Sequence, residues 1–548
     1  MTKKILFSFI LIMICGFIHA QDTIRKEVQV VKEYEPRISD PYKINELPDL
    51  QDTLTEVPDF SYQTRPFPFE TQFRVEPIKA ARMVGEPLQK LYGKHVKLGF
   101  GNYWSPLVYI GAHNLRSEEN SYGAHFSHYS SHGNVNLTPD KEVYAGTGDN
   151  ELSIYGKKFY EDLFVAGDIS LNSQARHFYG YGDQVLDTIN LDKRPVKQRY
   201  TQLSFDSRVK STYDDSAHIK YDFRFGYYYL RDQHNNYENQ IRFSSSNEKI
   251  FQAENIGLDA ELEFYDRSKP MDTTNQLIMG VTPWLGKFGD RWQVKAGINI
   301  MGDLRGDNQK IYYYPVASLE YNIVNNVLVP YAGIDGKLIR NTYNSIRQVN
   351  PFIQPGLNVA DTDQKFRLYG GIRGHFSSRT SFNFRASYQV CDNMYFFVNE
   401  NTPMANRFTV LYDYTELTRF FGELGFNIND RLFFHIKGNY YSYKLQTLDH
   451  PWHKPDFDLS FSGRYNIQDK IILSTDIYAI GTRYVENRSQ ADAYLDGSIE
   501  ADFEIKYFFS KILNGFVRFN NITGTDHQLW KNYPVQGFTV IAGAGYSF

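Results

Sequence analysis

The stretch from Gly537 to Phe548, GFTVIAGAGYSF, decides the fold because its two faces differ. Its even-numbered positions carry apolar or aromatic side chains, and its odd-numbered positions carry mostly small or hydroxylated ones. Successive side chains of a β-strand point to opposite faces, so this stretch predicts a strand with one apolar face and one small, wettable face. Two settings explain such a strand: a soluble sheet with one buried face, or a membrane β-barrel with lipid outside and water inside.

The first residues of the chain predict export. Lys3 and Lys4 precede an apolar run over residues 5–18, and Ala20 supplies the small residue of a cleavage site, so residues 1–20 read as a signal peptide. Only Cys391 remains after cleavage, which excludes an internal disulfide in the mature chain. The formal net charge of the whole chain is −4, and we expect no nucleic-acid partner, because such a partner favours a clustered basic surface.

Residues 21–93 differ in composition from the rest of the chain, because they hold eight of its 21 prolines. Proline disfavours both helix interiors and central strands, so we expect an extended periplasmic segment. Within it, VQVVKEY could dock a periplasmic or outer-membrane partner protein, or serve as an ordinary linker. The docking candidates in this motif are Val28, Val30, Val31 and Tyr34.

Residues 94–548 show strict alternation of apolar and polar side chains, for example over 381–390 and 495–507. Such runs match tilted transmembrane strands of about 9–11 residues, and they fit a mean hydropathy of −0.49, because only every second residue faces lipid. Short turns such as 289–291 and 467–470 alternate with long polar connections at 391–407, 444–455, 482–493 and 522–536. The pattern predicts a transmembrane antiparallel up-and-down β-barrel, an all-β fold. It has about 22 strands, or 20 if the weak candidate near residue 235 is not a strand.

The last hairpin, residues 514–548, resembles the C-terminus of TonB-dependent outer-membrane receptors. It has the Asn520–Asn521 corner, the Tyr533–Pro534 pair, an aromatic residue after Gly537 and a terminal phenylalanine. The resemblance implies a Gram-negative outer-membrane barrel surrounded by lipid and built by the barrel assembly machinery. It also implies an assembly signal formed by Phe538, Tyr546 and Phe548. Only about 73 residues precede the barrel, so we expect the plug domain of that family to be missing.

A barrel this wide is normally plugged. We therefore expect long loops, inward side chains and residues 21–93, or a partner protein, to fill its lumen. Inward polar side chains are expected to cross-link a wet lumen by ion pairs, although the acidic ones could instead form a cation or catalytic site. These lumen candidates are Arg367, Arg373, Arg385, Asp496, Glu500, Asp502 and Glu504.

Catalytic motifs such as GxSxG, HExxH and the P-loop are absent from the sequence, so we expect no enzyme, cofactor or metal site. In the loop DHPWHKPD, His450, Trp452 and His453 could contact a ligand or pack within the loop. Two functions fit best: solute uptake, or service as a structural subunit of an envelope complex whose N-terminal arm docks a periplasmic partner. An outer-membrane enzyme is a minor alternative.

Overall fold

The computed structural model describes residues 91–548 except 214, 252–253, 273, 325–326, 429–430, 487–492 and 525–526. The signal peptide and residues 21–90, which include the docking candidates Val28, Val30, Val31 and Tyr34, lie outside the described residues and stay predictions. No helix in the described part of the chain is long and apolar enough to cross a membrane.

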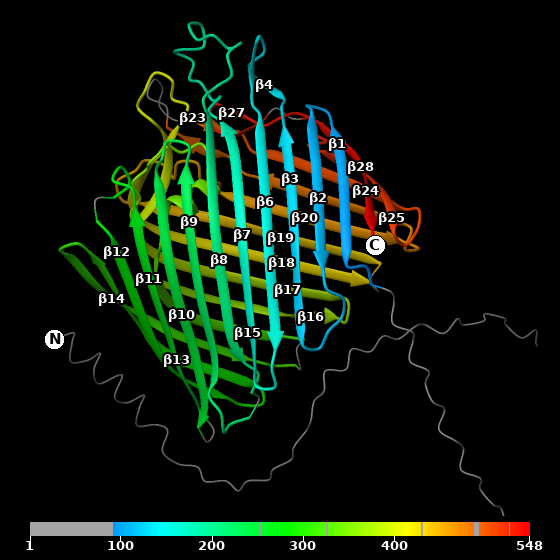
Figure 1. Ribbon diagram of the computed structural model, residues 1–548. Coiled ribbons are helices and arrows are strands. Elements are labelled where there is room, and N and C mark those ends of the chain that lie inside the picture. Colours follow the sequence, from blue (N-terminus) through cyan, green and yellow to red (C-terminus); the bar gives the residue numbers. More distant parts are fainter. Residues whose placement is uncertain are drawn as a thin grey trace, which may run out of the picture. The chain divides into compact units, whose positions relative to one another are not determined.

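The described chain forms a closed antiparallel barrel of 22 strands (Figure 1), as the alternation predicted. The strand near residue 235 is present as β10, so the alternative of 20 strands is wrong. The barrel strands are β1 (Lys94–Gly101), β2 (Ser105–His113), β3 (Asn120–Ser131), β6 (Thr147–Phe159), β7 (Leu163–His177), β8 (Lys197–Ser211), β9 (Lys220–Asp232), β10 (Tyr237–Phe251), β11 (Glu254–Arg267), β12 (Gln276–Phe288), β13 (Trp292–Arg305), β14 (Asn308–Tyr321), β15 (Val329–Ile339), β16 (Thr362–Ser377), β17 (Thr380–Asn399), β18 (Phe408–Ile428), β19 (Leu432–Leu445), β20 (Phe457–Ile467), β21 (Ile471–Ile480), β24 (Ser498–Phe508), β25 (Leu513–Asn520) and β28 (Thr539–Ser547).

The outer surface of the barrel is apolar, and its inner surface is polar. On β24, Ile499 is 57% exposed and Tyr507 40%, whereas the acidic residues between them point inward. Exposed Leu, Ile, Phe and Tyr side chains recur at alternate positions on strands all around the barrel. A soluble sheet would bury this face, whereas a closed barrel satisfies its backbone hydrogen bonds internally and can place the face in lipid.

The closing strand β28 lies between β25 and β1, and its even-numbered face is exposed as predicted. Tyr546 and Phe548 stack on this outer face with ring centroids 5.4 Å apart. The small odd-numbered residues have a function that the sequence did not reveal. Because Gly543 has no side chain, the ring of Phe516 on β25 lies over β28, and its centroid is 4.1 Å from Lys97 Nζ on β1.

The two ends of the barrel differ as expected. One end carries the short turns together with Lys94 and Phe548, whose backbones exchange hydrogen bonds of 3.0 and 2.9 Å. The other end carries the long connections, together with short turns at 102–104, 233–236 and 306–307, and in outer-membrane barrels that end faces the exterior. The prediction of a long polar connection over 391–407 is wrong in part, because β17 continues to Asn399 and stays paired with β18. Short strand pairs also occupy this end: β4 (Asn134–Thr138) with β5 (Lys141–Tyr144), β22 (Arg483–Val485) with β23 (Ala493–Leu495), and β26 (Gln528–Trp530) with β27 (Tyr533–Pro534).

Candidate functional site: the loop core and the cavity beneath it

The long connections fold together into one apolar cluster in the loop end of the barrel, which we call the loop core. Phe352 stacks on Tyr533 at 3.8 Å between ring centroids, and Tyr179 packs edge-on against Tyr533 at 4.8 Å. The cluster also contacts the inner wall, where the Tyr200 hydroxyl donates to the Pro351 carbonyl over 3.1 Å. Its buried aromatic members are Phe178, Tyr179, Tyr181, Tyr200, Tyr343, Phe352, Phe397, Phe408, Trp530 and Tyr533.

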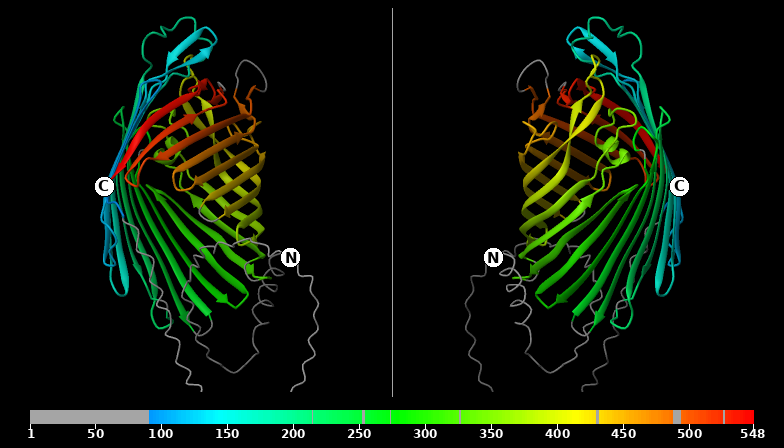
Figure 2. Two further views of the ribbon diagram at one scale, coloured as in Figure 1. Left: turned by 90° about the vertical axis from the view of Figure 1, so that its right-hand side faces the viewer. Right: turned by 90° about the vertical axis from the view of Figure 1, so that its left-hand side faces the viewer.

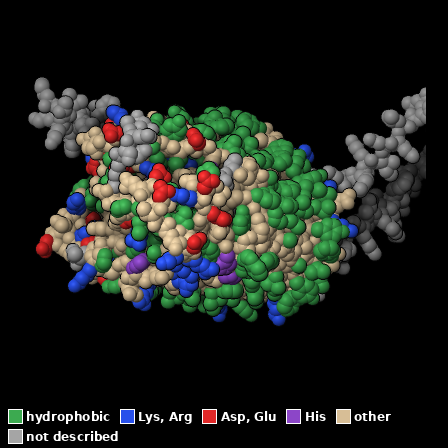
Figure 3. Space-filling model, turned by 90° about the horizontal axis from the view of Figure 1, so that it is seen from above, with side chains coloured by type: hydrophobic (Ala, Val, Ile, Leu, Met, Phe, Trp, Pro, Cys, Tyr) green, Lys and Arg blue, Asp and Glu red, His purple; other side chains and the backbone are tan. Residues whose placement is uncertain are grey.

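Figure 3 looks down on the loop end of the barrel and shows closely packed side chains over this face. Lys, Arg, Asp and Glu gather mostly over its middle, and many hydrophobic side chains lie toward its margin. The loop part of the expected lumen filling is therefore present in the described residues: the barrel's own connections occupy its mouth.

One connection, residues 340–361, contributes the helix α2 (Tyr343–Val349) to the loop core. The helix begins where its sequence allows a reciprocal cap. The Thr342 hydroxyl accepts from the Ser345 N–H at 2.9 Å, and the Ser345 hydroxyl accepts from the Thr342 N–H at 2.8 Å. Tyr343 and Ile346 are fully buried, so the helix is held by packing rather than by its own length.

A buried carboxylate anchors α2 to the barrel wall. Glu238 on β10 has no exposed surface and accepts hydrogen bonds from the backbone N–H groups of Tyr343 and Asn344, both at 3.1 Å. The same carboxylate accepts from Arg267 Nε at 2.9 Å and from the Tyr228 hydroxyl at 2.8 Å. A negative charge is favourable at a helix N-terminus, and this one is fully hydrogen-bonded.

Further polar contacts tie the same connection to other strands. The Tyr343 hydroxyl donates to Asp232 at 3.0 Å, and Arg347 donates to Gln202 Oε1 at 2.7 Å. Arg340, just before the helix, forms ion pairs with Glu261 and Glu263 on β11. Partners on β8, β9, β10 and β11 therefore fix one face of the connection.

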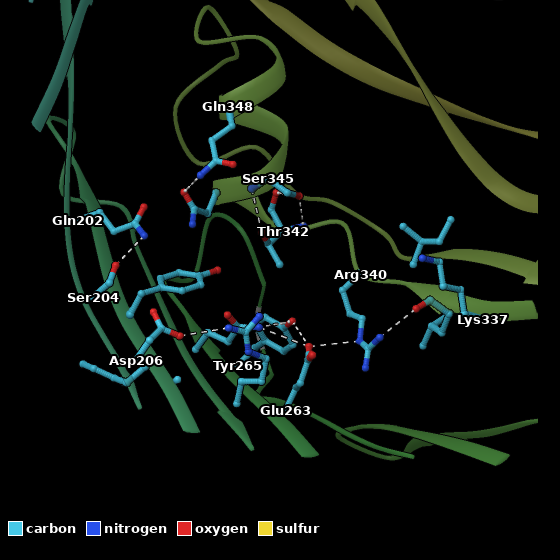
Figure 4. Close-up of a pocket in the computed structure, with 18 residues that line it drawn as sticks. Gln202, Ser204, Asp206, Glu263, Tyr265, Lys337, Arg340, Thr342, Ser345 and Gln348 are labelled. Atoms are coloured by element: carbon cyan, nitrogen blue, oxygen red, sulfur yellow. Dashed lines mark hydrogen bonds and ion pairs between the residues drawn. The ribbon is translucent and has the colours of Figure 1, made fainter. Parts of the chain in front are cut away.

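A polar cavity of about 430 Å³ lies between α2, the loop-end half of β8–β11 and the end of β15 (Figure 4). Asp206 and Arg242 form an ion pair of 3.2 Å on its wall. They meet across β9 at Gly226, where a Cβ atom would lie 2.7 Å from Asp206 Oδ1. The polar and charged residues that line it include Gln202, Ser204, Asp206, Arg242, Glu263, Lys337, Arg340, Asn344 and Gln348. Carboxylates, cations, amides and hydroxyls together suit a polar solute that both donates and accepts hydrogen bonds.

The lumen residues singled out from sequence lie elsewhere on the inner wall, in separate pairs. Arg367 donates two hydrogen bonds to Asp335, at 3.0 and 2.6 Å, and Arg373 pairs with Glu320 at 2.7 Å. Arg385 lies over the ring of Phe421 at 5.2 Å.

The acidic row on β24 divides in the same way. Glu504 accepts two hydrogen bonds from Arg518, at 2.9 and 2.7 Å. Asp502 accepts from the Asn521 N–H at 2.9 Å, and Glu500 lies 4.0 Å from His527 Nε2. Asp496 precedes β24 and is exposed, so it lies outside the strand that carries the other three acidic residues, and its place in the lumen stays a prediction. Within the described part of the chain, no three His, Cys, Asp or Glu side chains are grouped as a metal ion requires.

His453 is not a surface ligand-binding residue, because it lies buried in the loop region. Its Nδ1 is 2.8 Å from the Phe397 carbonyl, and its ring packs against Phe408 and Trp530. Burial, with Arg483, Lys531 and Lys454 nearby, lowers the pKa of His453 to about 3.

This buried histidine predicts acid sensitivity of the loop core. An exposed histidine has a pKa of about 6.5, so below that pH the unfolded loops bind a proton that the folded loops exclude, and stability falls as pH decreases. Between pH 6.5 and 4.5 the loss should be about 2.3 kcal/mol, because the exposed histidine is already half protonated at pH 6.5 and the slope then approaches about 1.36 kcal/mol per pH unit. Limited proteolysis of the loops at both pH values measures it. His453→Gln should flatten this dependence, and an unchanged pH profile in that variant would contradict the assignment.

A closed 22-stranded barrel with an apolar outer surface and a polar lumen is an outer-membrane β-barrel protein. Its structure is similar to the iron transporter FrpB of Neisseria meningitidis, with a TM-score of 0.64 and 10% identity over 84% of this chain and 82% of that one. It is also similar to the siderophore receptor PirA of Acinetobacter baumannii (TM-score 0.62, 11% identity, 84% and 81% covered). The ferric-catecholate import receptor Fiu of E. coli K12 gives a TM-score of 0.61 at 9% identity, with 84% and 82% covered.

These three proteins are TonB-dependent outer-membrane receptors, the class that the C-terminal hairpin resembles in sequence. The likeness establishes a shared fold. No protein-family model matches the chain, and no curated protein sequence matches it.

Proposed function

We propose that this protein is a non-enzymatic outer-membrane barrel for the uptake of a polar solute, with the loop core as its gate. The observation that carries the proposal is the cavity beneath α2, since it joins the gate to the lumen wall and offers donors and acceptors of both charges. The similarly folded proteins named above are called import receptors and transporters, which is consistent with uptake. The loop core occupies the mouth of the barrel, and we propose that it closes the lumen in the way a plug domain would.

The competing function is a structural subunit whose segment 21–93 docks a partner protein. Deleting residues 21–60 distinguishes the two, with two measurements: accumulation of labelled sugars, amino acids and short peptides by cells, and the set of proteins retained by the tagged barrel. Lost accumulation with unchanged retained proteins supports uptake. Lost partners with unchanged accumulation supports the structural role and contradicts our proposal.

The cavity can be tested separately with Gly226→Val. The new side chain would occupy the space between Asp206 and Arg242, so accumulation of the transported class should fall about tenfold, while the proteins retained through residues 21–60 stay the same. Gly156→Val is the matched control, because a Cβ atom there meets nothing within 4 Å. Normal accumulation in Gly226→Val would remove this cavity from the solute path.

A further inference from the structure

The ladder between β14 and β15 is unusually short. Only four residue pairs join these strands, from Ala317↔Ile334 to Glu320↔Tyr331 at the turn end. By contrast, β14 pairs with β13 along its whole length, and β15 pairs with β16 as far as Ile339. Above Ala317, therefore, the facing edges of β14 and β15 form no ladder with each other. Figure 2 shows this separation: the green strands diverge from the yellow-green strands that follow them, and the two sets are close only near their lower ends.

The hairpin register shows which backbone groups face this gap. Arg305 and Asn308 close the two-residue turn between β13 and β14, so the even-numbered residues of β14 hydrogen-bond to β13. Gln309, Ile311 and Tyr313 then direct their N–H and C=O groups toward β15. Pro315 has the same orientation but lacks an N–H group, as expected at an unpaired edge.

The gap lies at the depth of the lipid-facing surface. Ile311 is 65% exposed and Tyr313 64%, and exposed apolar side chains such as Ile298 and Met279 continue this surface over the neighbouring strands. The gap is closed toward the lumen by side chains. The Tyr314 hydroxyl donates to Asp363 on β16 at 2.8 Å, and its ring lies where a Cβ of Gly336 would be 2.8 Å from Cδ1. Tyr314 belongs to a buried apolar cluster on the lumen side of the gap, formed by Tyr265, Ile278, Met301, Tyr314 and Leu338.

We propose that the edge of β14 from Asn308 to Tyr314 docks an extended segment of a partner protein in the outer half of the membrane. Unpaired backbone groups in hydrocarbon need hydrogen-bond partners, and lipid tails have neither donors nor acceptors. An extended peptide supplies both by adding a strand to a sheet edge. Its outward side chains, at alternate positions, must be apolar to lie beside Ile311 and Tyr313. The inference concerns the wall of the barrel and does not depend on solute uptake.

Amide-resolved hydrogen exchange tests the proposal in three samples: the purified chain in detergent, the purified chain in lipid nanodiscs, and the barrel in native membrane patches with its partners. In both purified samples the amides of residues 309, 311 and 313 should exchange fast, and those of 310, 312 and 314 slowly. In native patches the first three should slow at least about tenfold.

Two results would overturn the inference. Fast exchange of all three amides in native patches means that no strand docks. Slow exchange already in nanodiscs means that lipid or β15 itself covers the edge. Ile311→Pro adds a variant test, because it removes an N–H that faces the gap and none that bonds β13. The assembled barrel should persist in this variant, and protection of the 309 and 313 amides in native patches should be lost. Tyr312→Pro is the matched control, because it removes a bond to β13 and should impair assembly instead.

Discussion

Gly543→Ala should remove most of the assembled barrel, although it adds only one methyl group. A Cβ at this position would lie 2.1 Å from the Leu98 carbonyl oxygen and 2.5 Å from Cζ of Phe516. The carbonyl belongs to the β1–β28 ladder that closes the barrel, so it cannot move away without breaking that ladder. Overpacking costs about 1–3 kcal/mol, and 1.4 kcal/mol is already a factor of about ten in the folded fraction.

Heat-modifiable migration of outer-membrane fractions measures the assembled form, which should fall at least about tenfold. Gly156→Ala on β6 is the matched control, since open space surrounds its Cβ position, and it should assemble normally. Equal amounts of assembled barrel in the two variants would show that the glycines of the closing strand are not needed for the seam.

The strands were predictable from the sequence because alternation is a local property. Each run of residues reports its own inward and outward faces. The weak strand near residue 235, present as β10, was predicted partly because an exported barrel with both chain ends in the periplasm needs an even number of strands. The reason for Gly543 could not be read in this way. It depends on Leu98 and Phe516, which come from strands at opposite ends of the barrel sequence and meet only when the barrel closes.

The loop core was not predictable for the same reason. Its members come mostly from connections and partly from strand ends, spread over residues 135–533, and each connection alone looks like a polar loop with a few aromatic residues. One local signal was present: Thr342 followed three residues later by Ser345, next to the apolar Ile346, marks a helix start between two strands. Nothing local marked Glu238, because its partners lie on a neighbouring strand and on a helix more than 100 residues away.

Glu238→Gln should loosen the loop core and open the barrel while leaving the wall assembled. The substitution keeps the size of the side chain but removes the charge that neutralises Arg267. It also replaces one accepting oxygen by an NH₂ group, which cannot accept from the N–H groups of α2. Breaking a buried ion pair by removing one partner costs about 3–5 kcal/mol. The substitution destabilises the contact between the connection and the barrel wall, and it leaves the strand ladders unchanged. Residues 340–361 should therefore detach before the barrel unfolds.

Planar-bilayer conductance measures the effect. The purified wild-type chain should show little conductance, and Glu238→Gln should show large channels together with protease cleavage within 340–361. Glu254→Gln is the matched control, because Glu254 forms an exposed ion pair with Lys287 at 3.5 Å, and such pairs are worth about 0–1 kcal/mol. A large, stable open channel from the wild-type chain would exclude the loop core as a gate. If the Glu238→Gln barrel instead shows no conductance and resists protease, the loop core would still be the gate. The aromatic packing around Tyr533, and not the buried charge, would then hold residues 340–361 in place.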